Sequence, residues 1–333
     1  MANLYITEQN STLRKTGDRL IVQKDKEVLL DVQCHKIDAV LIFGNVQFTT
    51  QAVHELFEHG IELAILTRTG RLIGQLTSPN TKNIELRLRQ FRRYDDSKYR
   101  LDYAKELVAA KIWNSRCVVQ SFSRNHPQAD LGGIIEELKR IYERTADAVS
   151  LETLLGMEGT AARVYFGAMG KMILVDLSFE GRRKRPPTDP VNSLLSLGYT
   201  MVFNEIASLL DGLGFDPYLG FFHSVDYGRA SLAADLMEPF RAPVVDRFTL
   251  NLLNLGMFKV DDFRPNPRGG ALYLRRESLK RYFSEYERYL SREVTHPGFN
   301  RKLTFRECFQ LQAERLAKAL HDEGKFIPYR LEN

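Results

Sequence analysis

The chain of 333 residues has few cysteines and no long uncharged apolar stretch, and both absences limit the kinds of protein it can be. Its three cysteines, Cys34, Cys117 and Cys308, are odd in number, widely separated and without a CxxC pair, which argues against a disulfide framework or a zinc knuckle. No run of about 18 uncharged apolar residues occurs, so no membrane span is expected. The N-terminus lacks a basic-then-apolar signal pattern, and we therefore expect a reducing, cytoplasmic location.

The charge of the chain is unevenly distributed. The whole sequence carries 47 Lys and Arg against 42 Asp and Glu, a net charge of +5 at pH 7. Residues 1–80 hold 8 of the basic and 9 of the acidic residues, whereas the rest of the chain holds 39 basic and 33 acidic residues. The net charge alone is weak evidence for a polyanion partner, but any surface that binds nucleic acid is expected mainly beyond residue 80.

Two hydrophobic patterns divide the chain. Short β-branched segments separated by turns predict strands within the first 80 residues, together with one helix that begins near Thr50 and ends near Gly60. Beyond "SPNTKN", apolar residues recur at helical spacing and predict helices over 84–120, 132–148, 150–176, 190–212, 230–240, 242–255, 276–291 and 303–323, with a loop at 263–270. The sequence predicts an α+β protein: a small N-terminal β domain (1–80), a linker (81–86) and a larger all-α domain (87–333).

A glutamate interrupts the apolar helical stretch "LETLLGMEGTAARVYFGAM". This residue, Glu158, lies between Met157 and Gly159, and a carboxylate taken out of water needs a partner or a metal ion because an isolated buried charge is costly. Tyr165 follows seven residues later and shares its helical face. From this helix alone, Glu158 could equally be exposed or paired with Arg163.

A second unusual stretch, "GFFHSVDYGRASLAADLMEPFR", combines one histidine with two carboxylates. His223 follows two phenylalanines, while Asp235 and Glu238 are three residues apart on one helical face. An imidazole and carboxylates from separate elements would suit Mg²⁺ or Mn²⁺. Spacing alone leaves other interpretations open, since His223 could be a core histidine, the acids could lie on a solvated face, and Glu238 could pair with Arg241.

Two basic segments are candidate nucleic-acid contacts. The segment "LRLRQFRRYDDSKYR" interleaves Arg and Lys with aromatic residues, but taken alone it is better explained as a solvated helix face. The loop at 182–185 gathers Arg182, Arg183, Lys184 and Arg185. Contacts to phosphates from such side chains depend on salt and tolerate any base sequence.

Several strings together resemble the universal CRISPR-associated spacer-acquisition integrase family. They are "GMEGTAARVYF", "RRKRPPTDPVNSLLSLGYT", "GFDPYLGFFH" and "AADLMEPFRAPVVDR", preceded by "LYITEQNSTLRKTGDRLIVQ" and "FGNVQFTTQAVHELFEHGIELAIL". They occur in the family's order and extend from about residue 3 to about residue 320. Each string alone is weak evidence, but their common order makes the resemblance specific.

The resemblance implies a metal-dependent DNA endonuclease and integrase. On it, Glu158, His223 and Glu238 bind one Mg²⁺ or Mn²⁺ ion, and Asp235 assists the site or orients a ligand. Tyr165 and the 182–185 loop are the candidate DNA contacts. The implied reaction inserts short DNA segments into a CRISPR array by attack of a 3′-hydroxyl.

The resemblance also implies partners. These are double-stranded DNA (protospacer and CRISPR repeat), a second copy of the chain in a homodimer formed through the β domain, and a small ferredoxin-like CRISPR adaptation protein; no membrane is involved. Two rival functions remain: a non-catalytic DNA-binding scaffold, and a metal hydrolase of small phosphate esters. The basic helical half argues against the second rival.

Overall fold

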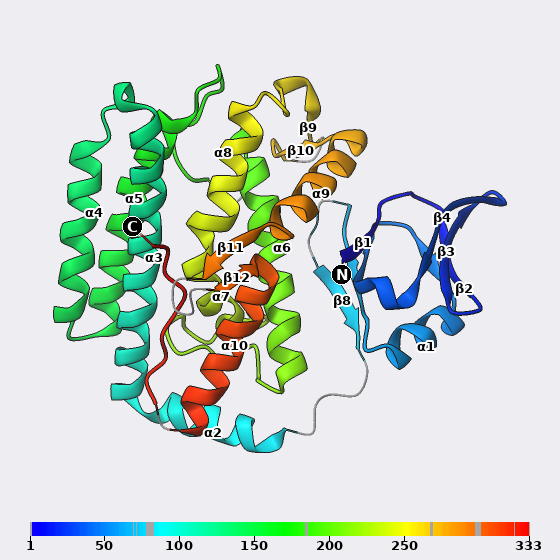
Figure 1. Cartoon of the computed structure of the whole chain (residues 1–333), viewed down its shortest axis with the longest axis horizontal. Coiled ribbons are helices and arrows are strands. Elements are labelled where there is room, and N and C mark those ends of the chain that lie inside the picture. The colour runs from blue at the N-terminus through cyan, green and yellow to red at the C-terminus, as the bar shows by residue number, and fades with distance from the viewer. Residues whose placement is uncertain are drawn as a thin grey trace. The chain divides into compact units, whose positions relative to one another are not determined.

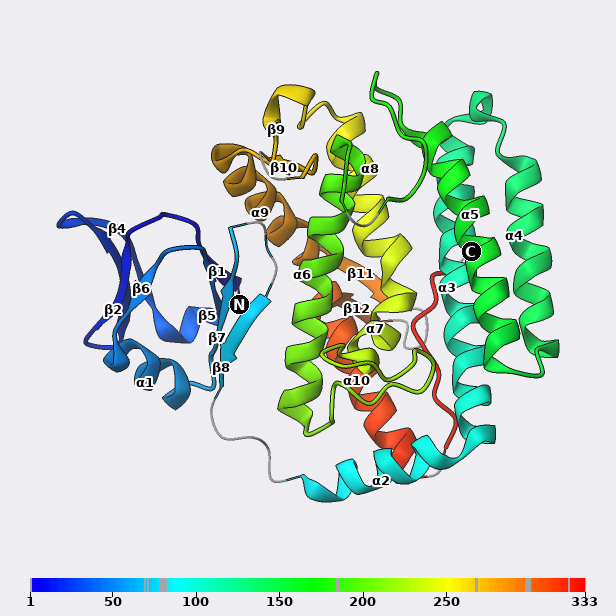
Figure 2. The ribbon, with the colours of Figure 1, turned by 180° about the vertical axis from the view of Figure 1, so that it is seen from behind.

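The computed structural model describes residues 2–332 except 69, 71, 78–82, 184–185, 267–268, 297–300 and 323. The chain forms two compact units (Figures 1 and 2), one of residues 1–80 with 275–288 and the other of residues 81–274 with 289–333. It is a mixed α+β protein, with strands at the N-terminus and mostly helices in the C-terminal region.

The described residues of the first unit form two four-stranded sheets. One sheet has the order β1 (Ala2–Ile6), β5 (Ile37–Phe43), β7 (Glu62–Leu66) and β8 (Leu72–Leu76), with β8 antiparallel to β7 and the other neighbours parallel. The other has the order β4 (Glu27–Gln33), β3 (Arg19–Lys24), β2 (Thr12–Thr16) and β6 (Gln47–Phe48). Strands β2, β3 and β4 are antiparallel neighbours, whereas the short strand β6, which was not expected, runs parallel to β2.

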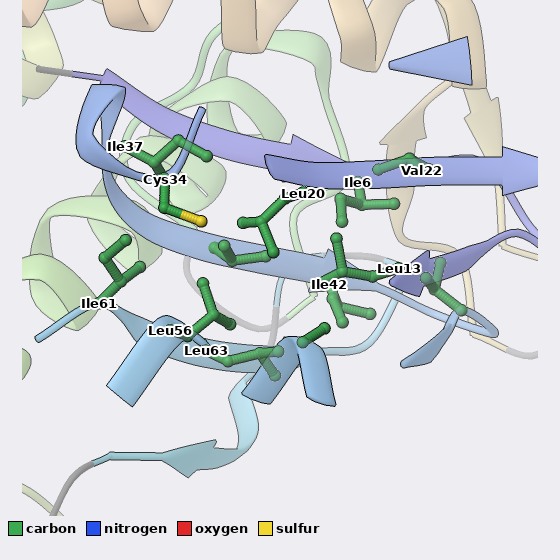
Figure 3. Packing of buried hydrophobic residues seen from close by; sticks show 13 residues of the cluster. Ile6, Leu13, Leu20, Val22, Cys34, Ile37, Ile42, Leu56, Ile61 and Leu63 are labelled. Atoms are coloured by element: carbon green, nitrogen blue, oxygen red, sulfur yellow. The ribbon is translucent and has the colours of Figure 1, made fainter. Parts of the chain in front are cut away.

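Aliphatic side chains from both sheets and from helix α1 (Thr50–Glu58) form one core in this unit (Figure 3). Leu13, Leu20, Leu56 and Leu63 have no exposed surface, and burying each such side chain contributes roughly 2 kcal/mol. The cap of α1 is Thr49, one residue before the expected Thr50, because its hydroxyl accepts a hydrogen bond from the Ala52 N–H at 3.2 Å.

A segment from the far end of the sequence packs within the same unit. Most of helix α9 (Arg276–Leu290) belongs to it, and the Phe283 ring lies 4.6 Å from Tyr5 and 4.7 Å from Phe43. The Tyr5 hydroxyl also donates to Glu287 at 2.5 Å. Such a contact joins residues more than 270 positions apart and has no local signal in the sequence.

The second unit is built mainly from helices. They are α2 (Ile84–Asp95), α3 (Ser97–Asn125), α4 (Gly132–Arg144), α5 (Leu151–Met172), α6 (Pro190–Leu213), α7 (Ser231–Met237), α8 (Arg247–Asn254) and α10 (Phe305–His321). Helices α3, α4 and α5 pack side by side, while α6 packs against α7, α8 and α10 (Figures 1 and 2).

The expectation of an all-α domain was wrong. Two antiparallel hairpins lie among the helices, one made by β9 (Phe263–Pro265) and β10 (Leu272–Leu274), the other by β11 (Glu293–His296) and β12 (Arg301–Thr304). Their strands have only three or four residues, which is too short for alternation to stand out against loop signals. The 263–270 stretch therefore reads as a loop although its first three residues pair.

The expected helix over 84–120 is two helices separated at Asp96. The side chain of Asp96 accepts a hydrogen bond from the Tyr99 N–H at 3.0 Å and caps α3, so the chain turns at this residue. Of the expected 81–86 linker, residues 81 and 82 lie outside the described residues. Asn83 caps α2, and residues 84–86 form its first turn.

Helix α6 begins at Pro190, as expected, after the cap Asp189, and ends at Leu213, where Gly214 caps it with a φ of +97° that suits glycine. By length and composition it could cross a membrane, but 61% of its most apolar window is buried inside the structure. The buried residues pack against neighbouring helices, as in the core helix of a globular unit.

The segment from Ser231 to Asn254 winds continuously but not uniformly. Helix α7 passes through a 3₁₀ turn at Glu238–Phe240 and a π-helical turn at Arg241–Asp246 before α8 begins. Pro239 and Pro243 lack an N–H, so regular α-helical hydrogen bonds cannot form at their positions. Departures from regular α-helix of this kind often occur at functional sites, and here Glu238 lies in the 3₁₀ turn and Arg241 in the π-helical turn.

Candidate active site

A pocket of about 770 Å³ in the second unit is lined by residues from α3, α5, α6 and the 220–246 segment. Glu158, Tyr165, Arg182, His223 and Glu238 all belong to its lining. The structure therefore brings together side chains that the sequence separates by up to 80 positions.

Asp235 organises one wall of the pocket. Its fully buried carboxylate accepts hydrogen bonds from the backbone N–H groups of Phe221, Phe222 and His223, at 2.8, 3.0 and 3.0 Å. The same carboxylate lies 2.6 Å from His223 Nδ1. This contact makes Nδ1 the protonated nitrogen and leaves the lone pair of Nε2 free for a ligand, because a neutral imidazole donates from only one nitrogen.

The loop that carries His223 approaches α7 very closely at Gly220. A Cβ atom on this residue would lie 2.7 Å from the carbonyl carbon of Ser231, a distance that no side chain tolerates. Ser231 in turn donates from its hydroxyl to the Ser224 carbonyl at 2.8 Å. Glycine is therefore required here to seat the loop over Asp235.

Glu158 and Glu238 both form ion pairs with one lysine, Lys111, which the sequence analysis did not identify as a site residue. Lys111 Nζ, on α3, contacts Glu158 Oε1 and lies 2.6 Å from Glu238 Oε2. His223 Nε2 lies 3.7 Å from Glu238 Oε1. Glu158 thus pairs with Lys111, not with Arg163 as its helix alone allowed.

Glu238 also pairs with Arg241, as its spacing allowed. Arg241 Nε lies 3.0 Å from Glu238 Oε2, and the glutamate is 4% exposed. Burial by itself would raise the pKa of Glu238, but Arg241, Lys111 and His223 together hold that pKa well below its ordinary value. Burial likewise opposes the charge on Lys111, but the two glutamates raise its pKa above the ordinary value, so Lys111 keeps its charge.

Tyr165 belongs to a buried network and not to the exposed surface expected of a DNA contact. It is 3% exposed and lies close to Asp246, which accepts a hydrogen bond from the Tyr199 hydroxyl. Burial raises the pKa of Asp246 to about 6, against the opposing effect of these tyrosines and of Arg241. This network supports the wall behind Glu238.

The two described side chains of the 182–185 loop differ: Arg182 is held by contacts within the fold, and Arg183 is exposed. Arg182 donates to Asn192 Oδ1 at 2.8 Å and to Ser196 Oγ at 3.1 Å, and its guanidinium lies over the Tyr199 ring. Arg183 is exposed and pairs with Glu180 at 2.7 Å. Residues 184 and 185 lie outside the described residues, so the structure does not place them.

Much of the basic segment at 86–100 holds the site's loops in place. Gln90 is completely buried and donates to the carbonyls of Asp216 and Leu219, both at 2.8 Å. Arg100 donates to the carbonyl of Phe221 at 3.1 Å, two residues before His223. Part of this segment thus serves the fold, which a count of basic residues does not indicate.

A different cluster of possible metal ligands lies in the first unit. Among the described residues, Cys34, Glu55 and His59 form a group of three whose ligand atoms lie within 4.8 Å of one another; Glu158, His223 and Glu238 do not, and Lys111 Nζ lies between the two glutamates. Cys34 lies in the core (Figure 3), and burial raises the pKa of its thiol to about 11. Glu55 already pairs with Lys15, so this cluster needs no added cation for charge balance.

The donors of the pocket fit a divalent cation. Two carboxylates and one imidazole nitrogen, from α5, the 3₁₀ turn and the His223 loop, are the ligand types that Mg²⁺ and Mn²⁺ accept. The two glutamates already hold a positive charge between them in the form of the Lys111 ammonium. The two glutamates therefore already bind one positively charged group at this position.

Comparison with known proteins finds relatives over the whole chain. A 34% identical protein, the CRISPR-associated endonuclease Cas1 3 of Thermus thermophilus, matches over 322 residues, 96% of this chain and 94% of its own. The endonuclease Cas1 1 of Chlorobaculum tepidum is 31% identical over 98% of this chain and 96% of its own. A Cas4/Cas1 fusion of Geobacter sulfurreducens is 33% identical, and this chain spans 59% of its length.

Solved structures share the fold. A Cas6-RT-Cas1–Cas2 complex matches with a TM-score of 0.83 and 28% identity over 99% of this chain and 36% of that one. A casposase bound to an integration product matches with a TM-score of 0.86 at 23% identity, over 100% of this chain and 96% of its own. The family model described as CRISPR associated protein Cas1 matches residues 4–288. The chain therefore belongs to the Cas1 family of CRISPR-associated proteins, whose relatives of similar length are named endonucleases.

Proposed function

We propose that this chain is a metal-dependent DNA endonuclease and integrase that inserts short DNA segments as spacers into a CRISPR array. One observation carries the proposal: Glu158 and Glu238 both contact the Lys111 ammonium, and His223, whose Nδ1 is hydrogen-bonded to Asp235, lies beside them. Ordinary ion pairs need no such histidine, and the open pocket beside it leaves room for a substrate.

Glu158, His223 and Glu238 would hold the metal ion, with Asp235 fixing the imidazole. When bound, Mg²⁺ or Mn²⁺ supplies charge stabilisation to a phosphodiester and promotes ionisation of an attacking hydroxyl. Asp235 keeps His223 Nε2 turned to the pocket throughout, because its four contacts hold both the ring and the loop backbone. Arg241 and Lys111 place positive charge where the transferred phosphate carries negative charge.

The proposed reaction is a transesterification. The 3′-oxygen of the captured DNA forms a bond to a phosphorus atom in the CRISPR repeat, and the bond from that phosphorus to the 3′-oxygen of the broken strand is cleaved. The attacking hydroxyl loses a proton and the departing oxygen gains one, so the number of phosphodiester bonds is unchanged and no ATP is consumed. Water in place of the hydroxyl gives cleavage, the nuclease activity.

The rim of the pocket suits a DNA backbone. Arg163 and Arg229 line it and are exposed, and Arg183 lies near in sequence to the lining residue Arg182. These side chains would bind phosphates without reading bases, which is what accepting spacers of any sequence requires. We propose double-stranded DNA, both protospacer and repeat, as the substrate.

We also propose a homodimer formed through the β-rich unit, a small ferredoxin-like CRISPR adaptation protein as partner, and a cytoplasmic location. The partner is supported by the similarity to a chain from a Cas6-RT-Cas1–Cas2 complex. The homodimer is supported by β4, the outermost strand of its sheet, which exposes Val28, Leu29 and Leu30 at 53, 41 and 38%. An exposed apolar edge strand presents unpaired backbone N–H and C=O groups, which favours pairing with another chain.

Replacing Val28 and Leu30 together with lysine should weaken the dimer at least tenfold, because charge on an edge strand opposes pairing. Light scattering over a concentration series should give twice 38.3 kDa for the parent and a larger share of 38.3 kDa for the variant. The control is Val149→Lys, which charges an apolar residue of the helical unit that is even more exposed, at 83%. A parent that stays at 38.3 kDa at micromolar concentration would contradict the homodimer.

The experiment that tests the function uses duplexes that differ only at the 3′ end. With Mn²⁺ present, a labelled duplex with 3′-hydroxyls should be joined to a plasmid carrying a CRISPR repeat, and a duplex with 3′-dideoxy ends should not. The dideoxy duplex should still bind with the same affinity, since only the nucleophile is missing. Both duplexes are incubated with the purified full chain and the ferredoxin-like partner.

The same experiment separates the rival functions. A non-catalytic scaffold would bind both duplexes and neither join nor cut DNA. A hydrolase of small phosphate esters would cleave p-nitrophenyl phosphate and leave the plasmid intact. Either result would replace the proposed function.

A further inference from the structure

Lys111 occupies the position at which the two glutamates could share a metal ion. It is a residue of the long helix α3, its side chain is 16% exposed, and its ammonium contacts one oxygen of Glu158 and one of Glu238. Helix α3 packs directly against α5 and against the 3₁₀ turn that carries Glu238. The lysine is therefore held between the carboxylates by tertiary packing.

The two glutamates of this cluster are already matched by two cations before any metal arrives. Glu158 and Glu238 are matched by Lys111 and Arg241, while Asp235 is occupied by His223 and three backbone N–H groups. With a neutral His223, Asp235 leaves the cluster one negative charge, and adding a divalent cation turns this into an excess of one positive charge, which a largely buried site disfavours.

Metal and ammonium also compete for the same oxygen atoms. Lys111 Nζ lies 2.6 Å from Glu238 Oε2, and an Mg²⁺ or Mn²⁺ ion would lie about 2.0–2.2 Å from a ligand oxygen. Two cations at such distances from one oxygen repel strongly. Arg241 is less able to leave, because it also stacks over Tyr199 at 4.8 Å.

We propose that Lys111 is a built-in competitor of the metal ion, and that it leaves the glutamates only when metal and DNA bind together. A lysine has a flexible four-carbon stem, and the pocket lined by Lys111 is where the DNA phosphate would lie. The phosphate supplies the negative charge that the metal-loaded cluster lacks and receives the displaced ammonium. This inference rests on the proposed function and adds that metal and DNA affinities are coupled.

Coupling of this kind is reciprocal and measurable without catalysis. One ligand typically changes the affinity for another, bound at a second site, by about 5- to 150-fold. The probe is Mn²⁺, whose free concentration is followed by electron paramagnetic resonance, with and without a saturating duplex that has 3′-dideoxy ends and cannot react. Parent, Lys111→Met and Lys111→Gln proteins are compared, after thermal melts have shown which variants are folded.

In the parent, the duplex should tighten Mn²⁺ binding about tenfold or more. Lys111→Met should bind Mn²⁺ about tenfold more tightly than the parent without DNA, and the duplex should then change its affinity little. Lys139→Met removes an exposed lysine from α4, outside both basic segments, and should behave as the parent. Cys34→Ser should leave the Mn²⁺ affinity unchanged, which places the ion away from the cluster in the first unit.

Two results would overturn the inference while leaving the proposed metal site intact. One is equal or weaker Mn²⁺ binding by folded Lys111 variants than by the parent. The other is an Mn²⁺ affinity of the parent protein that does not change when DNA is added. This second result rules out the coupling even if neither Lys111 variant folds. A parent that binds no Mn²⁺ under any condition would instead contradict the proposed function itself.

Discussion

Replacing Asp235 with alanine is expected to lower the free energy of unfolding by about 3–5 kcal/mol. The carboxylate is fully buried and accepts hydrogen bonds from the backbone of Phe221, Phe222 and His223. Alanine leaves these N–H groups buried without an acceptor, and each such group costs about 1–3 kcal/mol. Urea denaturation followed by circular dichroism measures the loss. Because the loop that carries His223 depends on these bonds, Mn²⁺ binding should be lost as well.

Two further variants show whether the effect comes from these bonds. Asp235→Asn keeps one acceptor oxygen but turns an NH₂ group toward N–H donors, so its loss of stability should be intermediate. Asp226→Ala removes an exposed acid from the same loop and should cost less than about 1 kcal/mol. An Asp235→Ala protein with the parental denaturation midpoint would show that this carboxylate does not hold the loop.

Replacing Glu158 with alanine is expected to reduce both DNA joining and DNA cleavage by a factor of about 10²–10³ or more, while duplex binding changes little. A metal ligand acts mainly on the transition state, where the ion supplies several kcal/mol, and 1.36 kcal/mol corresponds to a factor of ten in rate. Binding depends mostly on Lys and Arg contacts with phosphates, and removing one anion near DNA should tighten it slightly, if at all. Rates come from a gel assay of plasmid joining, and affinities from fluorescence anisotropy.

The matched control is Glu152→Ala, which removes an exposed glutamate from the first turn of the same helix. It should keep the parental rate. The Glu158 variant should also stay folded, because its side chain is partly exposed and Lys111 retains Glu238 as partner. Joining at the parental rate by Glu158→Ala would make this helix structural and the proposed mechanism wrong.

Local signals in the sequence located most of the elements. Strands β1 to β5 and the helices from α4 to α10 lie where alternation and helical spacing predicted them, because these periodicities depend on residues only a few positions apart. The splitting of the first long helix at Asp96 was missed, since its apolar spacing continues across the break.

Part of the site was also readable. The three-residue spacing predicted that Asp235 and Glu238 would be neighbours, and it allowed the Glu238–Arg241 pair that the structure contains. The unusual placement of Glu158 among apolar residues marked it as a residue in need of a partner. The identity of that partner was not readable, because Lys111 lies 47 residues earlier on another helix.

The sequence by itself determined the order of strands and helices, the family, and the residue types available for a metal site. Only the tertiary structure decided which of them meet: that Lys111 stands between two glutamates, that Asp235 holds the His223 loop, and that Gln90 is a buried anchor within a basic segment. Helical and strand periodicities come from interactions within a few residues, whereas burial and charge pairing depend on how distant elements pack. A buried polar group takes whatever partner that packing provides, because leaving it without one costs more than any local preference.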